Sequence, residues 1–210
     1  MDLGLGNLAE LKGQLLAASL RADTNYDAVI TGIGTGVAAA MERFCNRKFG
    51  YAAGEVDYCS ADRRHWYLKR YPAYALLECA KKDSEGDGWV EFAPPPDGSS
   101  LVQQMRLETG YLMFVAIQGY YWSQLRFTYN GGYWYDTTED GSGVRPAGAQ
   151  ALPGDVKLAW YWQCQHAWKR WDKLGAQIAE DPEKTGAVAS YKLTDGVKEM
   201  LRRHRRFQIT

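Results

Sequence analysis

The stretch Leu152-Pro153-Gly154-Asp155-Val156-Lys157 opens the strongest helical pattern of this chain, which predicts a helix over residues 154–175. Pro153 just before the pattern and Gly175 at its end are typical of helix boundaries. Apolar residues recur every three or four positions and form one continuous face. The face consists of Val156, Trp160, Cys164, Ala167, Trp171 and Leu174. The fold is therefore expected to be built around a helix with this face buried.

Three further aromatic residues of this helix, Tyr161, Trp162 and Trp168, lie outside the apolar face. One core-facing stripe does not need so many rings, so we expect the helix to be buried on two sides or to contact another subunit. The runs Tyr120-Tyr121-Trp122 and Tyr133-Trp134-Tyr135 indicate either a stacking platform or core and interface positions, and strand alternation favours the second. The predicted subunit-interface residues are Trp160, Tyr161, Trp162, Trp168, Trp171, Tyr133, Trp134 and Tyr135.

Two helices are predicted near the start of the chain, over residues 7–20 and 25–46. Asn7 and Thr24 each precede an acidic residue by three positions, which is the spacing of a helix cap. Glycines interrupt the second helix, and each weakens it by up to about 1 kcal/mol relative to Ala unless close packing offsets the loss. They are Gly32, Gly34 and Gly36.

Residues 51–135 are rich in aromatic side chains, alternating apolar positions and turn signals, which predict a small antiparallel sheet. Two loops, residues 83–88 and 108–111, have the composition of hairpin turns. The last strand ends at Asn130-Gly131-Gly132. The following residues, 136–151, are rich in Gly, Thr and Asp and predict a loop that is either flexible or ordered against a neighbour.

The composition excludes several classes of protein. The chain of 210 residues is long enough for a real core, and 46% apolar residues exclude a disordered chain. No apolar run approaches the roughly 20 residues needed to cross a bilayer, and Met1-Asp2-Leu3-Gly4 lacks the basic start of a signal peptide. The 25 basic and 25 acidic residues cancel, whereas proteins that grip DNA non-specifically usually carry a basic excess.

No catalytic, cofactor or metal site is predicted. The glycine-rich run 31–36 lacks the strand and the Gly-Lys-Ser/Thr of a phosphate-binding loop. The three histidines stand outside any nucleophile elbow or His-Glu-x-x-His motif, and Asp136, Glu139 and Asp140 do not match a calcium loop. The separated cysteines lack zinc spacing and indicate free thiols in a reducing cytoplasm. They are Cys45, Cys59, Cys79 and Cys164.

The chain ends in a polar linker, residues 180–190, and a short helix predicted over residues 194–206. Val197 and Leu201 are its apolar anchors. The run Arg202-Arg203-His204-Arg205-Arg206 indicates a solvated tail, a nucleic-acid contact or a segment that binds an acidic protein groove.

Five segments, in their order along the chain, resemble the head–tail connector (adaptor, or head-completion) proteins of tailed bacteriophages. They are Met41-Glu42-Arg43-Phe44-Cys45-Asn46-Arg47-Lys48-Phe49, Tyr67-Leu68-Lys69-Arg70-Tyr71-Pro72, Gly110-Tyr111-Leu112, Tyr129-Asn130-Gly131-Gly132-Tyr133 and Leu152-Pro153-Gly154-Asp155-Val156-Lys157-Leu158-Ala159. The long sheet region, the Trp-rich helix and the tail that follows it depart from the family pattern.

The resemblance implies a structural virion protein of the neck, made in the cytoplasm of a bacterial host. It implies a homo-oligomeric ring of about twelve copies that docks on the portal protein, continues the DNA channel and presents a surface to the next neck or tail protein. Near-zero net charge suits a channel through which double-stranded DNA slides. No membrane contact and no enzymatic activity are expected. Two alternatives stay open: a tail-completion protein, and an aromatic-rich glycan- or nucleic-acid-binding module.

The C-terminal segment is expected to dock into the portal, because a basic helix with few anchors follows a polar linker. Its removal is expected to leave the fold intact. The predicted portal-docking residues are Tyr191, Leu193, Val197, Leu201, Arg202, Arg203, Arg205, Arg206 and Phe207.

The expected fold class is α+β: mainly a helical bundle with an inserted small antiparallel β-sheet region and a C-terminal tail helix. The expected division is a connector core over residues 1–180, followed by a linker and basic docking segment over residues 181–210. Within the core, the β-rich insertion occupies residues 51–135 and the flexible loop residues 136–151.

Overall fold

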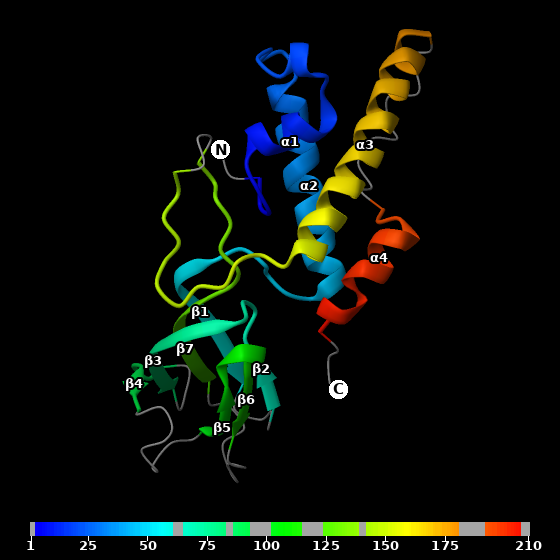
Figure 1. Cartoon of the computed structure of the whole chain (residues 1–210). Helices are drawn as coiled ribbons and strands as arrows, with labels where there is room; N and C mark the ends of the chain where they lie inside the picture. Colours follow the sequence, from blue (N-terminus) through cyan, green and yellow to red (C-terminus); the bar gives the residue numbers. More distant parts are fainter. Residues whose placement is uncertain are drawn as a thin grey trace. The chain divides into compact units, whose positions relative to one another are not determined.

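The chain folds into two compact units (Figure 1). The structure, a computed structural model, describes residues 3–60, 65–82, 86–92, 102–114, 124–138, 142–180 and 192–206. The first unit, which we call the helical unit, comprises Met1–Arg47, Tyr135–Arg145 and Leu152–Thr210. The second, which we call the sheet unit, comprises Lys48–Trp134 and Pro146–Ala151.

The described part of the helical unit contains four α-helices. They are α1 (Leu8–Leu15), α2 (Asp27–Cys45), α3 (Gly154–Glu180) and α4 (Asp195–Leu201), with short 3-10 turns η1 (Ala18–Leu20) and η4 (Arg202–His204). The helix predicted over residues 7–20 is interrupted at Leu16, where the backbone becomes extended. Asn7 caps α1 as predicted, because its side chain accepts a hydrogen bond from the Glu10 amide at 2.8 Å.

The ends of α2 do not follow its predicted capping pattern. No side chain caps its start at Tyr26, so the predicted Thr24 cap is wrong. Its last turn closes at Asn46, which has a left-handed backbone with a φ of 52°. Asn adopts this conformation more readily than most residues, and it commonly ends a helix there.

The core of the helical unit centres on Trp160 of α3, whose side chain is fully buried. Its indole N–H donates a hydrogen bond to the carbonyl oxygen of Gly34 on α2, with 3.1 Å between the two atoms. A Cβ atom on Gly34 would lie 3.0–3.2 Å from the side chains of Leu3 and Leu11, and one on Gly6 would lie 2.8 Å from the Trp160 ring. Gly34 is therefore a packing glycine, as predicted.

The described part of the sheet unit contains two antiparallel sheets. The first has the strand order β1-β7-β3-β4 and the second the order β2-β6-β5. The strands are β1 (Ala52–Ser60), β2 (His65–Tyr67), β3 (Ala73–Lys82), β4 (Val90–Glu91), β5 (Val102–Arg106), β6 (Tyr111–Phe114) and β7 (Gln124–Gly131). The two predicted hairpins connect β3 to β4 and, through the 3-10 turn η2 (Leu107–Thr109), β5 to β6.

Alternation along β7 decides which side chains enter the core of the sheet unit. Leu125, Phe127 and Tyr129 are fully buried, whereas Arg126 and Thr128 between them are partly exposed. The buried residues join a cluster to which both sheets contribute. It consists of Cys59, Leu68, Ala73, Cys79, Leu112, Leu125, Phe127 and Tyr129. One face of the four-stranded sheet therefore packs on the core, and the other carries the partly exposed side chains.

The expected fold class, mainly a helical bundle with an inserted small sheet and a tail helix, is wrong. The described residues are 40% helical and 28% strand, and their four α-helices accompany two antiparallel sheets, so that the fold is mixed α+β. The sequence pattern identified the local hairpins. It also identified the last strand, β7, but it gave no signal for the pairing of β7, in which Thr128 lies opposite both Val56 and Glu78, residues that are distant in the sequence.

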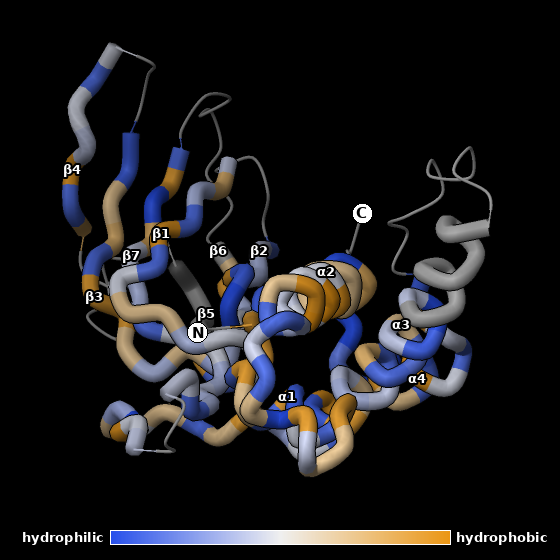
Figure 2. Tube along the Cα trace, turned by 90° about the horizontal axis from the view of Figure 1, so that it is seen from above, coloured by the Kyte–Doolittle hydropathy of each residue, from blue (hydrophilic) through white to orange (hydrophobic). Residues whose placement is uncertain are grey.

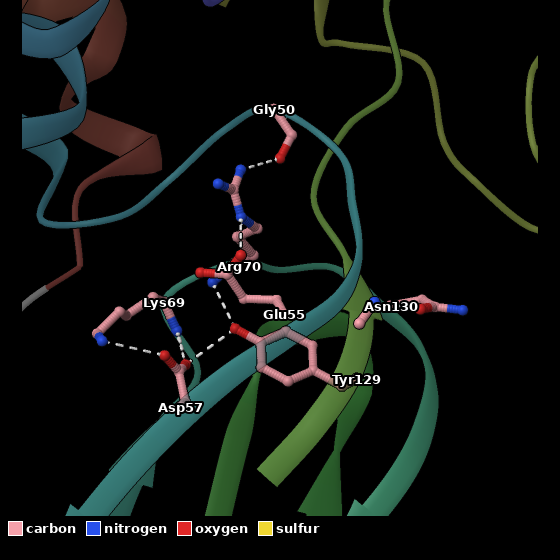
Figure 3. Close-up of polar contacts among 8 residues, drawn as sticks. Gly50, Glu55, Asp57, Lys69, Arg70, Tyr129 and Asn130 are labelled. Carbon is pink, nitrogen blue, oxygen red and sulfur yellow. Dashed lines mark hydrogen bonds and ion pairs between the residues drawn. The ribbon is translucent and has the colours of Figure 1, made fainter.

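A buried carboxylate holds the connection between β2 and β3 (Figure 3). Asp57 of β1 is fully buried, and its Oδ2 atom accepts hydrogen bonds from the Lys69 amide at 2.6 Å and the Tyr129 hydroxyl at 2.9 Å. The Tyr129 hydroxyl accepts from the Arg70 amide at 3.0 Å, and the Arg70 Nε atom donates to Glu55 at 2.9 Å. Burial and the negative charge of Asp57 raise the pKa of Tyr129 above its usual range, so the hydroxyl keeps the proton that it donates.

The substitution Tyr129→Phe removes this hydroxyl and keeps the ring. We expect it to lower the free energy of unfolding by about 1–3 kcal/mol, because Asp57 loses a hydrogen-bond donor in a buried site. Urea unfolding of the purified chain measures the change. The control is Tyr58→Phe, because Tyr58 is 54% exposed, and its effect should stay within about 0.5 kcal/mol. Equal losses in both variants would contradict the role of the network.

All four cysteines are free and buried. Burial raises the pKa of Cys45 and of Cys79 to about 12, so that little thiolate forms near neutral pH. We expect Ellman's reagent to label no cysteine in the folded chain and all four after unfolding in urea. Rapid labelling of the folded chain would show that this packing is wrong.

Candidate assembly surfaces

The C-terminal helix α4 packs against α2 and α3 of its own chain. Three of the predicted docking residues are buried in this contact: Leu193, Val197 and Leu201. Gln163 of α3 brackets the start of α4, because its side chain donates to the Lys192 carbonyl at 3.2 Å and accepts from the Thr194 amide at 3.0 Å. Deleting α4 would uncover this apolar surface, which argues against the expectation that the fold survives its removal. Tyr191 and Phe207 lie outside the described residues.

Asp155, in the first turn of α3, anchors the end of the same segment. Its carboxylate accepts from Arg203 at 2.7 Å and from His204 at 2.6 Å. Burial tends to raise the pKa of Asp155, but the hydrogen bonds and charges of His204 and Arg203 outweigh it and hold the pKa below its usual value. The helix N-terminus also favours a carboxylate at this position. The ionised form of Asp155 therefore stabilises the docked segment.

The remaining arginines have different surroundings. Arg205 lies over the ring of Phe44, 5.3 Å from its centroid. The backbone amide of Arg206 donates to the Cys45 carbonyl at 2.9 Å. The side chain of Arg202 reaches a Glu199 oxygen at 3.2 Å and is still 72% exposed. The predicted basic run therefore makes contacts within its own chain, while the side chains of Arg202, Arg203 and Arg205 stay exposed.

Because the pKa of Asp155 is lowered in the folded chain, its stabilising effect is present above the unfolded-state pKa of about 3.9 and is lost as pH falls through the folded value. We expect Asp155→Asn to raise hydrogen exchange of the α4 amides near neutral pH to the level that the unmodified chain reaches only in acid. Exchange corrected for intrinsic rates measures this. The control is Asp87→Asn, an exposed aspartate of the sheet unit. Unchanged α4 exchange in Asp155→Asn would contradict the anchoring role.

The aromatic residues of α3 divide between core and surface. Trp160, which was predicted at a subunit interface, is instead fully buried within its own chain. Tyr161 is half-buried, with the Lys157 ammonium 5.9 Å from its ring centroid. Trp162 is 52% exposed, and Leu158, one turn earlier, is 44% exposed. We call Leu158 and Trp162 the α3 ridge.

The other predicted interface residues are less exposed than the α3 ridge. The rings of Trp168 and Trp171 stack with 5.1 Å between their centroids, and the ring of Tyr26, just before α2, meets that of Trp168 edge-on with 5.8 Å between the centroids. Tyr133, Trp134 and Tyr135 are half-buried. The backbone amides of two of them donate to carbonyl oxygens within the sheet unit: Tyr133 to Phe49 and Trp134 to Gln150.

A further apolar surface lies on the sheet unit, on a strand that the sequence pattern did not identify. Along β1, Asp57 and Cys59 are buried, while Val56 is 37% and Tyr58 54% exposed. The ring of Trp89, just before β4, lies 5.8 Å from that of Tyr58. What we call the outer sheet face consists of Val56, Tyr58, Glu78, Trp89 and Arg126. Figure 2 shows hydrophobic and hydrophilic residues following one another along these strands. This alternation is the sequence signal that indicates such a surface.

His65 and His204 each contact a polar side chain of their own chain. The Nδ1 atom of His65 lies 2.7 Å from the Tyr111 hydroxyl, and His204 binds Asp155. Among the described residues, His, Cys, Asp and Glu side chains do not gather in groups of three or more that would hold a metal ion. In the same residues, none of the helices combines the length and apolarity of a bilayer span.

Comparisons with known proteins find a similar fold in solved structures of a gene transfer agent particle. No protein-family model and no curated protein match the chain. A chain in the neck of an empty gene transfer agent particle, solved with C6 symmetry, is similar, with a TM-score of 0.54, 12% identity and coverage of 100% of this chain and 93% of that one. A chain in the virion of the native particle gives the same TM-score and identity and is covered to 94%. At this identity the likeness establishes a shared fold.

Proposed function

We propose that this chain is a structural protein of the neck of a phage-like particle, where it forms a ring that joins head and tail. The observation that carries the proposal is the fold shared with a chain in the neck of a gene transfer agent particle, a neck solved with C6 symmetry. The similarity covers the whole chain and therefore both units. It is not limited to a helix pair or a sheet, motifs that recur in unrelated proteins.

In this proposal the chain is a head–tail connector, or adaptor, that lies beneath the portal protein and continues the channel for double-stranded DNA. About twelve copies form the ring, a number that sixfold symmetry accommodates with two copies per repeat. The equal numbers of basic and acidic residues suit a channel wall, because strong phosphate contacts would hold the DNA. The chain acts by binding its neighbours, without a catalytic step.

We assign the contact with the portal to the C-terminal segment. The apolar residues of α4 hold this segment on its own chain, so contact with a partner falls to the side chains on its solvent side. Arg202 is 72% exposed there. A guanidinium group in this position suits a carboxylate on the partner, which it binds through two parallel hydrogen bonds. Charge reversal at Arg202 tests this contact without touching the buried anchors.

Light scattering of the purified chain, alone and mixed with the portal protein of the same particle, tests the proposal. We expect a ring-sized species or a stoichiometric portal complex. Arg202→Glu should lose the portal complex with unchanged circular dichroism, and the matched control Arg170→Glu, an exposed position on α3, should keep it. A monomer that ignores the portal would contradict the proposed function. An intact complex with Arg202→Glu would contradict only the docking contact.

A further inference from the structure

The outer sheet face has an aromatic centre with a paired charge beneath it. Tyr58 and Trp89 contact each other through their rings, and the Arg126 guanidinium lies 4.9 Å from the Trp89 ring centroid. Arg126 also forms an ion pair with Glu78, which accepts a hydrogen bond from Thr128 at 3.4 Å. The pair comes from neighbouring strands, β7 and β3, on the face opposite the core. The ring and ion-pair contacts hold the centre of this face in one arrangement.

The charge of this face indicates what it binds. The charges of this face balance: Arg126 pairs with Glu78, and the strand register adds one lysine, Lys82, and one more carboxylate, Glu91, to the same side of the sheet. Val56 and Tyr58 are its exposed apolar side chains. A nucleic-acid surface would need a basic excess. Trp, Tyr and Arg with few unpaired charges are instead the composition of the energetic centre of a protein–protein interface. The outer sheet face therefore fits an apolar protein surface.

The α3 ridge is an apolar surface of matching character. Leu158 and Trp162 are one helical turn apart, and the next positions on the same side are Gln165 and His166. At these four positions α3 has no lysine, arginine or carboxylate that would be placed against the aromatic centre of the outer sheet face. An unpaired charge buried between two such surfaces would weaken association by several kcal/mol in general terms; here neither surface supplies one at its centre.

A cyclic ring requires two different contact surfaces on each copy. Each contact in a cyclic ring joins two different patches of the same chain. Among the exposed large apolar side chains of the described residues, Val56 and Tyr58 lie on the outer sheet face, and Leu158 and Trp162 form the α3 ridge. Leu20, Leu77, Val90 and Val144 lie outside both surfaces. The outer sheet face and the α3 ridge thus supply the two different patches that a head-to-tail contact requires.

We infer that the α3 ridge of one copy docks on the outer sheet face of the next copy. The inference rests on the proposed ring and names the two surfaces that close it. Trp162 is the inserted side chain, and Tyr58 and Trp89 form its receiving surface. Copies associate through this contact without the portal when the chain is concentrated. Trp162→Ala and Tyr58→Ala should each weaken self-association at least about tenfold.

Cross-linking through engineered cysteines tests the contact directly, because the four native thiols are buried. Tyr58→Cys and Trp162→Cys are purified separately, mixed at high concentration and treated with a short bismaleimide. We expect a covalent dimer from the mixture and none from either variant alone, since the contact joins different patches. The double variant should form a ladder of multimers. Leu20→Cys and Val144→Cys replace exposed apolar side chains outside both surfaces and should not cross-link with either partner.

Light scattering of the same samples separates the possible failures. Circular dichroism first confirms that each variant is folded. An oligomer that persists without a Tyr58→Cys to Trp162→Cys product overturns the assigned surfaces and leaves the ring proposal standing. Cross-linking of either variant with itself overturns the head-to-tail arrangement. If the samples show no association and no cross-linking at the highest concentration, the inference is overturned as well. The ring proposal is then decided by mixing the chain with the portal protein.

Discussion

The helical unit depends on one close approach, between Trp160 of α3 and Gly34 of α2. The buried indole donates to the Gly34 carbonyl, and the space beside Gly34 is taken by Leu3 and Leu11. This contact sets how α3 lies on α2. It also explains the exposed tryptophan, because residues two positions apart on an α-helix point about 200° away from each other. Burial of Trp160 therefore turns Trp162 outward.

In the sheet unit, too, the residues that must be buried decide which residues are exposed. The buried network of Asp57 and Tyr129 and the burial of Cys59 decide which face of β1 points to the core. Since side chains alternate along a strand, Val56 and Tyr58 must point away from it. A shift of one residue in β1 would bury Tyr58 and expose the Asp57 carboxylate. The polar network thus specifies the register, and the outer sheet face is its consequence.

The predictable parts of the structure were those with local signals. The start of α3, the Asn7 cap and the hairpin pairs β3–β4 and β5–β6 follow from spacing, capping chemistry and turn composition. The predicted end of α3 at Gly175 is wrong, because the helix continues to Glu180. The two-sheet architecture was not predictable, because β7 pairs with strands that are distant in the sequence. For the same reason the buried Asp57 went unnoticed.

The candidate surfaces show a similar limit. The aromatic richness of α3 indicated a contact surface, but helical spacing alone did not separate Trp160, which fills the core, from Trp162, which is exposed. The C-terminal segment was expected to be free to dock, whereas its three apolar residues complete the core of the helical unit. Whether an apolar residue of a short segment serves its own chain or a partner depends on tertiary contacts that the pattern does not contain.

In the proposed neck, the molecule is a ring subunit whose two units each present one surface to a neighbour. Imaging the neck of particles that carry this chain by electron cryomicroscopy tests that claim most directly. We expect a closed ring of copies between head and tail, with α3 of each copy against the sheet unit of the next. Absence of the chain from the neck, or its presence there as isolated copies, would contradict it.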